Sequence, residues 1–252
     1  MKVMQKILVL LPALLLIHTA QAAAQPGETF RDCPDCPEMV SIPAGSFIMG
    51  SPLSEKGRDS DETQATVAIS MPFAAGKYEV TFAEWDACMA AGGCSGYRPA
   101  DSGWGRGRQP VINVSWKDAM QYAQWLSQKT GKTYRLLSEA EWECASRAGA
   151  AATYSFGNEE TQLGKYAWYN ANSGKQAHPV GEKLPNAFGL HDVHGNVWEW
   201  VEDCYNGDCA YHVLRGGAWS YSPRLLRAAA RGWSDSAERN YFIGFRLART
   251  LP

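Results

Sequence analysis

The chain has 252 residues, of which 45% are hydrophobic, 12% aromatic and 20% charged, and its formal net charge is −2. This composition excludes disordered, collagen-like and coiled-coil proteins, and the near balance of 24 basic and 26 acidic residues argues against nucleic-acid binding through bulk positive charge. The ten tryptophans, eleven tyrosines and 24 glycines predict one turn-rich domain whose core depends on large rings.

Residues 1–23 are predicted to be a secretory signal peptide. Two lysines precede the apolar run 7–17, and Ala20-Gln21-Ala22 gives the small-x-small pattern that signal peptidase cleaves. A membrane anchor is the alternative, but about 11 apolar residues are too few to span a bilayer, which needs about 20. We therefore expect a periplasmic or secreted protein without a membrane span, in which a polar arm over residues 24–37 leads into the domain.

Six of the seven cysteines fall into local pairs, and an oxidising compartment would make these pairs disulfides. The pairs are Cys33 with Cys36, Cys88 with Cys94, and Cys204 with Cys209. A redox role for Cys33 and Cys36 is the alternative, but this pair precedes a strand instead of opening a helix. Cys144 is left over and is expected to be a buried free thiol.

The elements predicted after the arm are short strands, three helices and long loops. Residues 39–50 alternate like a hairpin bent at Pro43-Ala44-Gly45, and residues 65–71 alternate with period two. Each helix is predicted from a capping hydroxyl followed three positions later by an acid: Thr81 and Glu84, Ser115 and Asp118, Ser138 and Glu141. Beyond Gly149 irregular loops and short strands are expected, which gives an α+β domain over residues 38–252.

Several separated motifs occur in a fixed order along this domain. They are Ile42-Pro43-Ala44-Gly45, Arg135-Leu136-Leu137-Ser138-Glu139-Ala140-Glu141-Trp142-Glu143, Gly195-Asn196-Val197-Trp198-Glu199-Trp200, Arg215-Gly216-Gly217 and Gly244-Phe245-Arg246. Together they resemble the sulfatase-modifying-factor family, to which the formylglycine-generating enzymes belong. The resemblance covers about residues 38–250 and implies a C-type-lectin-like α+β fold with much irregular structure.

The resemblance does not extend to the catalytic cysteines of that family. In the formylglycine-generating enzymes a cysteine pair shortly after a Gly-Gly-Ser segment binds copper(I), a metal that soft thiolates select. Here Ala218 replaces the serine, and no cysteine follows Cys209. We therefore expect neither bound copper nor formylglycine generation, and we assign no catalytic residue.

A calcium site of the family is matched more closely. The resemblance implies oxygen ligands from four positions: Asp192, Gly195, Val197 and Glu199. The alternative is that Asp192 and Glu199 only cap turns in a hydrogen-bonded loop. A transition-metal site at His191 and His194 is a further alternative to a structural role for these two histidines.

The C-terminal segment 211–252 combines seven arginines with only two acids, Asp235 and Glu238. With its aromatic residues it is predicted to line a cleft for an anionic or aromatic ligand. The candidate ligand-binding residues are Trp198, Trp219, Tyr221, Arg231 and Trp233. The alternative for Arg215 and Arg246 is that they satisfy buried carbonyls and carboxylates while the other arginines are solvated.

Two classes of function follow from the resemblance. One is an exported accessory or maturation factor that acts on a peptide or small product, as some family members do in siderophore chromophore maturation. The other is a non-catalytic module that binds a protein, a peptide or a small molecule on the same surface. An enzyme should place a titrating group with a shifted pKa or a redox metal in the cleft, whereas a binder needs only shape and stacking.

Overall fold

The computed structural model describes residues 26–251 of the chain. The predicted signal peptide, residues 1–23, lies outside this range. No helix in the described part is both long and apolar enough to cross a membrane.

Two sheets form the centre of the molecule. The first has five strands in the order β1-β2-β5-β11-β6, and every pairing in it is antiparallel. Its strands are β1 (Thr29–Phe30), β2 (Met39–Ile42), β5 (Phe73–Gly76), β11 (Leu247–Thr250) and β6 (Tyr134–Leu136). The second has the order β10-β7-β8-β9, and its strands are β10 (Ile243–Phe245), β7 (Trp198–Tyr205), β8 (Asp208–Arg215) and β9 (Arg231–Asp235). A separate ribbon pairs β3 (Gly45–Met49) with β4 (Ala65–Ile69).

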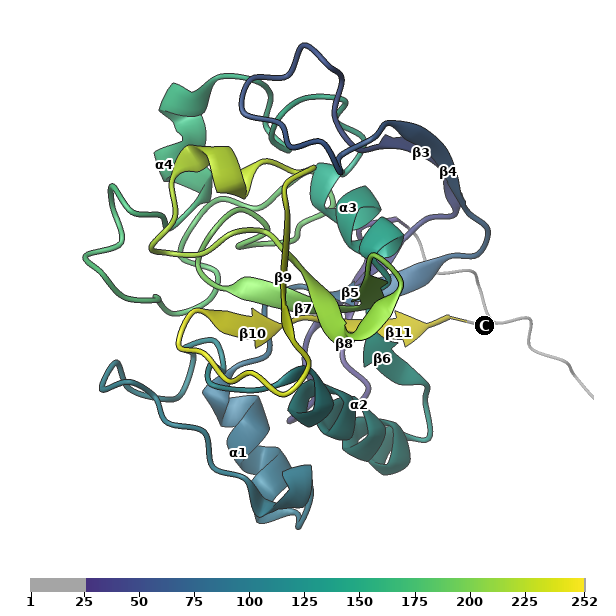
Figure 1. Cartoon of the computed structure of the whole chain (residues 1–252). Helices are drawn as coiled ribbons and strands as arrows, with labels where there is room; N and C mark the ends of the chain where they lie inside the picture. Colours follow the sequence, from purple (N-terminus) through teal and green to yellow (C-terminus); the bar gives the residue numbers. More distant parts are fainter. Residues whose placement is uncertain (1–25, 252) are drawn as a thin grey trace, which may run out of the picture.

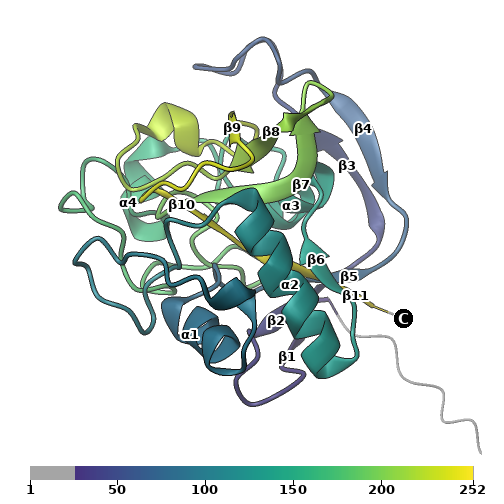
Figure 2. The same ribbon diagram turned by 60° about the horizontal axis from the view of Figure 1, so that its bottom comes forward.

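The three predicted helices are confirmed: α1 (Phe82–Ala90), α2 (Trp116–Thr130) and α3 (Glu139–Arg147). Each begins with a complete capping box, so the hydroxyl and the acid satisfy amides that a helix start leaves free. In Figures 1 and 2, α1 and α2 lie on one side of the sheets, whereas α3 and the short α4 (Leu163–Tyr166) lie on the other side. The result is the α+β architecture expected from the sequence.

Residues 39–50 do not form the predicted hairpin. All four residues of β2 are buried, and this strand pairs with β1 and β5, whereas β3 turns away and pairs with β4. The two halves of the apolar run thus belong to two different sheets. Because β2 is buried and has a neighbour at each edge, no edge of it remains for β3. The polar arm also takes part, since β1 extends the five-stranded sheet.

All three predicted disulfides are present, namely Cys33–Cys36, Cys88–Cys94 and Cys204–Cys209. Each closes a short loop: Cys88 lies near the end of α1, and Cys204 and Cys209 join β7 to β8 beside their turn. Cys144 is a free, half-buried thiol as expected, and burial raises its pKa to about 11.

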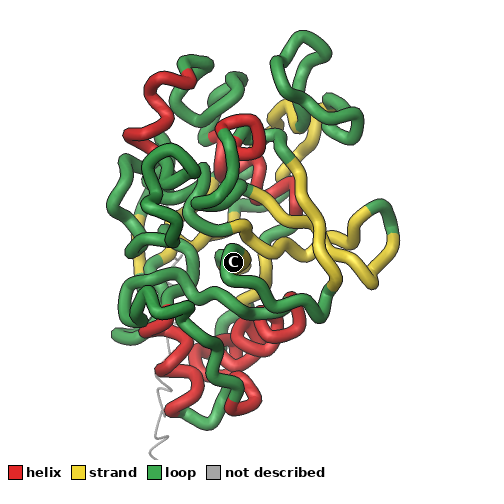
Figure 3. The backbone as a smooth tube through the Cα atoms, turned by 60° about the vertical axis from the view of Figure 1, so that its left-hand side comes forward, coloured by secondary structure: helices red, strands yellow, loops and turns green. Residues whose placement is uncertain are grey.

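Long loops fill the side of the molecule that carries residues 148–197, as Figure 3 shows. The strand β10 then runs parallel to β7, with Ile243 opposite Trp198. Gly244 lets β10 pack closely against Val111, because a Cβ at Gly244 would lie 2.5 Å from the carbonyl oxygen of that residue. The motif that contains Trp198 and the Gly-Phe-Arg motif, about fifty residues apart in the chain, thereby lie side by side at one edge of the second sheet.

Candidate functional site

Buried arginines support the region around the second sheet. Arg215, at the end of β8, is fully buried and donates hydrogen bonds to the carbonyl oxygens of Ala228, Ala229 and Ala230. It also pairs with Glu143 of α3. One guanidinium therefore fixes the segment that leads into β9, since its planar fork can satisfy several acceptors at once.

Arg246 has the same role at the other end of the sheet. It pairs with Glu199 at 2.8 Å and donates to the carbonyl oxygens of Gly76 and His191. Arg215 and Arg246 thus satisfy buried carbonyls and carboxylates, which was the alternative prediction for these two residues.

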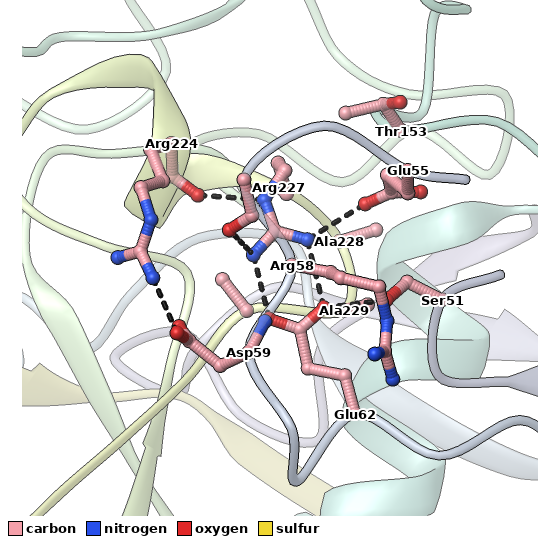
Figure 4. Close-up of polar contacts among 12 residues, drawn as sticks. Ser51, Glu55, Arg58, Asp59, Glu62, Thr153, Arg224, Arg227, Ala228 and Ala229 are labelled. Carbon is pink, nitrogen blue, oxygen red and sulfur yellow. Dashed lines mark hydrogen bonds and ion pairs between the residues drawn. The ribbon is translucent and has the colours of Figure 1, made fainter. Parts of the chain in front are cut away.

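A loop over residues 51–62, which we call the strap, is held against the C-terminal segment (Figure 4). Arg227, of which 1% of the side chain is exposed, contacts Glu55 at 2.7 Å and Glu62 at 2.6 Å. Its remaining donors reach the carbonyl oxygens of Gly57 and Arg224. The strap is therefore anchored by a buried ion-pair network, and its tip is placed beside β9.

A cleft of about 690 Å³ lies between the strap, β9 and the loop that precedes β10. Its lining carries five aromatic rings: Trp198, Tyr205, Tyr221, Trp233 and Phe242. The charged residues of the lining are Asp59, Asp61, Arg231 and Glu238. None of the residues that line it in the described structure is a cysteine.

The rings form two groups that contact one another within each group. Trp198 meets Tyr221 edge to face with the centroids 5.6 Å apart, and Tyr221 meets Phe242 in the same way. On the opposite side Trp233, which is 53% exposed, stacks on Tyr205 at 5.4 Å. Such pairs hold aromatic faces in fixed orientations, which suits the binding of a flat ligand.

Burial raises the pKa of Tyr221, although a hydrogen bond with Trp198 lowers it in part. This tyrosine lies four residues after Gly217, in the stretch that carries the catalytic cysteines in the formylglycine-generating enzymes. Because its pKa is raised, the Tyr221 hydroxyl is neutral at pH 7.

The seven C-terminal arginines neither gather along the described cleft, which Arg231 alone of them lines, nor remain unpaired. Every one of the seven C-terminal arginines forms an ion pair with a carboxylate: Arg215, Arg224, Arg227, Arg231, Arg239, Arg246 and Arg249. Arg231 lines the cleft as predicted, but Glu139 binds it through both oxygens and Asp61 contacts it at 3.1 Å. The arginines are evident in the sequence, but the acids that pair with them are far away along the chain and could not be identified from it.

Four of the five predicted ligand-binding residues line the cleft, namely Trp198, Tyr221, Arg231 and Trp233. Trp219 does not, because only 8% of it is exposed and its ring packs against Trp104 and Tyr241. It supports the loop behind the wall of rings.

Phe242 is one of the aromatic residues of segment 211–252 that were predicted to line a cleft, and it does. Two functional candidates were missed by the sequence analysis: Tyr205 and the acidic tip of the strap at Asp59 and Asp61. The strap is recognisable in the sequence only as a charged loop. Its acids could have been matched to the arginine-rich C-terminal segment by charge complementarity, but nothing local indicates which acid meets which arginine.

The predicted calcium ligands lie on one buried turn and on β7. Asp192 accepts a hydrogen bond from the Gly181 amide through one oxygen, and its other oxygen is buried without a partner in residues 26–251. Glu199 is already bound, because Trp142 donates to it at 2.6 Å and Arg246 pairs with it. No group of three His, Cys, Asp or Glu side chains within the described range is arranged to hold a metal ion.

Buried negative charges outnumber positive charges around this turn. Glu79, Asp192 and Glu199 interact with one another and with the single guanidinium of Arg246. Burial, with these neighbours, raises the pKa of Asp192 to about 6 and that of Glu79 well above its usual value. The residues fit a cation at Asp192, which has an oxygen to offer, better than at Glu199, which does not.

The two histidines of this turn have structural contacts. His191 Nδ1 lies 2.8 Å from the Lys183 carbonyl oxygen, and His194 Nδ1 lies 2.7 Å from that of Leu226. His194 is buried, and burial lowers its pKa to about 4. These contacts favour the structural alternative over a shared transition-metal site.

Comparison with known proteins agrees with this geometry. Residues 25–251 match the model of the sulfatase-modifying factor enzyme 1-like domain. The structure of PvdO from Pseudomonas aeruginosa is similar with a TM-score of 0.83 and 41% identity, over 91% of this chain and 100% of that chain. Treponema denticola variable protein 1 is similar with a TM-score of 0.74 and 29% identity, over 88% of this chain and 98% of that chain.

Among curated proteins, the formylglycine-generating enzyme of Streptomyces coelicolor is 37% identical over 175 residues, which is 57% of this chain and 54% of that enzyme. The match thus spans about half the length of that curated relative. Since the family model matches nearly the whole described chain, and the fold and the ordered motifs agree, the resemblance seen in the sequence is confirmed: this chain belongs to the sulfatase-modifying factor enzyme 1-like family.

Proposed function

We propose that this protein is an accessory or maturation factor that binds a peptide or a small product in the aromatic cleft, and that it does not generate formylglycine. The observation that carries the proposal is the composition of the cleft wall. Five rings and four charged side chains line it, and the stretch after Gly217 supplies Tyr221 and Leu225 instead of thiols. This lining suits stacking and polar recognition, and it offers no soft ligand for copper(I).

The thiols elsewhere do not compensate for this difference. Six cysteines are held in disulfides, and the free thiol of Cys144 lines a different, smaller pocket beside β3. Its raised pKa also disfavours the thiolate that metal binding requires.

The test is oxygen consumption and peptide mass after incubation with a cysteine-containing sulfatase peptide and copper(I). The Streptomyces coelicolor enzyme serves as the positive control under the same conditions. We expect no oxygen uptake and no formylglycine with this protein. Turnover above the copper-only background would contradict the proposal.

A second candidate, a non-catalytic binding module, is favoured by exposed rings that line the cleft or pack against its lining. Tyr211, Trp233 and Tyr241 are 37%, 53% and 47% exposed, and such rings usually mark a contact surface. The two candidates differ in what happens to the ligand. A binder returns its ligand chemically unchanged, whereas a maturation factor alters the ligand's mass or absorbance.

Export is part of this proposal. Three disulfides in one domain are typical of an oxidising compartment, and the sequence of residues 1–23 has the features of a cleaved signal. N-terminal sequencing of the protein recovered from periplasm and medium tests this directly. A mature chain that starts near residue 24 is expected, and an uncleaved cytoplasmic chain would contradict it.

Calcium at the turn of Asp192 is also proposed, with carbonyl oxygens of Gly195 and Val197 as further ligands. The unpartnered oxygen of Asp192 and the surplus of buried carboxylates support it. Glu199 would have to share its oxygens with Arg246 and Trp142, so the test depends on Asp192. Bound calcium would stabilise the turn without taking part in chemistry at the cleft.

A further inference from the structure

The charged groups around the cleft are mainly carboxylates. Asp59, Asp61 and Glu238 line it, and Glu139 lies directly behind Arg231. Three guanidinium groups oppose these four acids, namely those of Arg224, Arg231 and Arg215, which also lies 3.8 Å from Glu139. The described rim therefore has a surplus of one negative charge, although the C-terminal segment taken alone is basic.

The cations near the cleft are already occupied. All three donor nitrogens of Arg231 contact Glu139 or Asp61, at 2.6 to 3.1 Å. Arg224 pairs with Asp59. Arg58, also on the strap, donates to Ser51 and does not line the cleft. An anionic ligand would thus have to displace an existing partner, at the cost of leaving a carboxylate unpaired.

Glu238 is the carboxylate that remains available. It is exposed, and no ion pair to it occurs among residues 26–251. It follows β9 in the chain and lines the same cleft as Trp233. A cation held between this carboxylate and the ring would gain from both, because the faces of aromatic rings also attract positive charge.

Resting on the proposed function, we infer that the cleft selects a ligand that carries a protonated amine or guanidinium group next to an aromatic ring. The ring stacks on Trp233, which is itself stacked on Tyr205, and the cation faces Glu238. The anionic ligand expected from the arginine count is disfavoured. The same chemistry is found in small aromatic amines and in peptides that join an aromatic residue to lysine or arginine.

Three probes with one ring and different charge test the inference: tyramine (cationic), 3-(4-hydroxyphenyl)propanamide (neutral) and 3-(4-hydroxyphenyl)propanoate (anionic). Their Kd values are measured at pH 7 by calorimetry or by ligand-observed NMR. We expect tyramine to bind about fivefold or more tightly than the amide, and the propanoate to bind weakest. Raising the salt from about 20 mM to about 500 mM should shrink these differences, because exposed charges are screened.

Two variants and a control separate ring from charge. Trp233→Ala should weaken all three probes, whereas Glu238→Gln should weaken tyramine about threefold and leave the amide unchanged. Glu159→Gln removes an exposed acid outside the cleft and should change none of the values. The peptides acetyl-Tyr-Arg-amide and acetyl-Tyr-Glu-amide, compared in the same way, show whether the ligand is a peptide.

The outcomes separate the ligand class from the site. Equal binding of the three probes, or tightest binding of the propanoate, with loss in Trp233→Ala, would overturn the cationic preference and leave the cleft as the binding site. No binding of any probe at millimolar concentration, or binding unaffected by Trp233→Ala, would overturn the proposed site and the inference with it.

Discussion

Two regions of the molecule use arginine and aromatic residues for opposite purposes. In the support around Arg215 and Arg246 the guanidinium groups are fully buried and their partners are backbone carbonyls and carboxylates of distant elements. At the cleft the ring of Trp233 remains exposed, and Arg231 is the one cation among the described residues that line it. The comparison teaches that the arginines of the Arg-Gly-Gly and Gly-Phe-Arg motifs are bound inside the fold, whereas the cleft proposed for recognition presents an exposed ring.

Breaking the buried support should have the largest effect. Arg215→Met removes a fully buried cation and leaves three carbonyls without their donor, so we expect a loss of about 3–5 kcal/mol in the free energy of unfolding. Arg239→Met is the matched control, because Arg239 is 44% exposed where it pairs with Asp118. That change should cost less than about 1 kcal/mol. Urea denaturation measures both, and equal losses would contradict the distinction.

Releasing the strap tests the link between the two regions. Glu62→Gln weakens the pair with Arg227 and should cost about 3 kcal/mol at pH 7. Burial would raise the pKa of Glu62, but hydrogen bonds from Arg227 and Ser51 outweigh it and place the pKa below the ordinary value of 4.5.

A depressed pKa stabilises the folded state at pH values above 4.5, and this contribution is lost as the pH falls through the folded-state pKa. The difference in unfolding free energy between the wild type and Glu62→Gln should therefore shrink as the medium becomes acidic. A difference that stays constant down to pH 3 would show that Glu62 does not act through its charge.

Calcium binding should stabilise the support without changing the cleft. At a hundredfold excess over Kd, calcium would add about 2.7 kcal/mol to the stability of the wild type. Asp192→Asn should lose most of this gain, because it removes the charge of the predicted side-chain ligand whose second oxygen is unpartnered in residues 26–251. Thermal unfolding with calcium and with chelator measures the gain. An identical midpoint in both conditions would leave Asp192 as a purely structural residue.

The smallest effect on stability is expected in the cleft itself. Trp233→Ala removes a ring that is 53% exposed, so the free energy of unfolding should change by less than about 1 kcal/mol. Binding of an aromatic probe should nevertheless weaken about fivefold to tenfold, since the stacking surface is lost. A large loss of stability with unchanged binding would reverse the roles assigned to the two regions.

Features with local signals were predictable from the sequence. The capping pairs at Thr81, Ser115 and Ser138 lie within one helical turn, and each disulfide joins cysteines at most six residues apart. Of the four cleft residues, Trp198 lies in an ordered motif of the family, and Tyr221, Arg231 and Trp233 were predicted from the arginine- and aromatic-rich segment between two further motifs.

Non-local pairing was not predictable. The hairpin expected at Pro43 was wrong because β2 takes its neighbours from β1 and β5, and alternation alone does not identify a partner strand. The charge of the cleft was misjudged for the same reason, since Asp61 and Arg231 are 170 residues apart in the chain.

The most direct test of the binding cleft is a titration of the labelled protein with tyramine, followed through the tryptophan indole N–H signals in NMR spectra. The account predicts that the signals of Trp198 and Trp233 shift. Those of Trp85 and Trp200 should not move, because they are buried and bonded to the carbonyl oxygens of Tyr97 and Val114. Shifts confined to Trp85 and Trp200, or no shift at saturating tyramine, would contradict it.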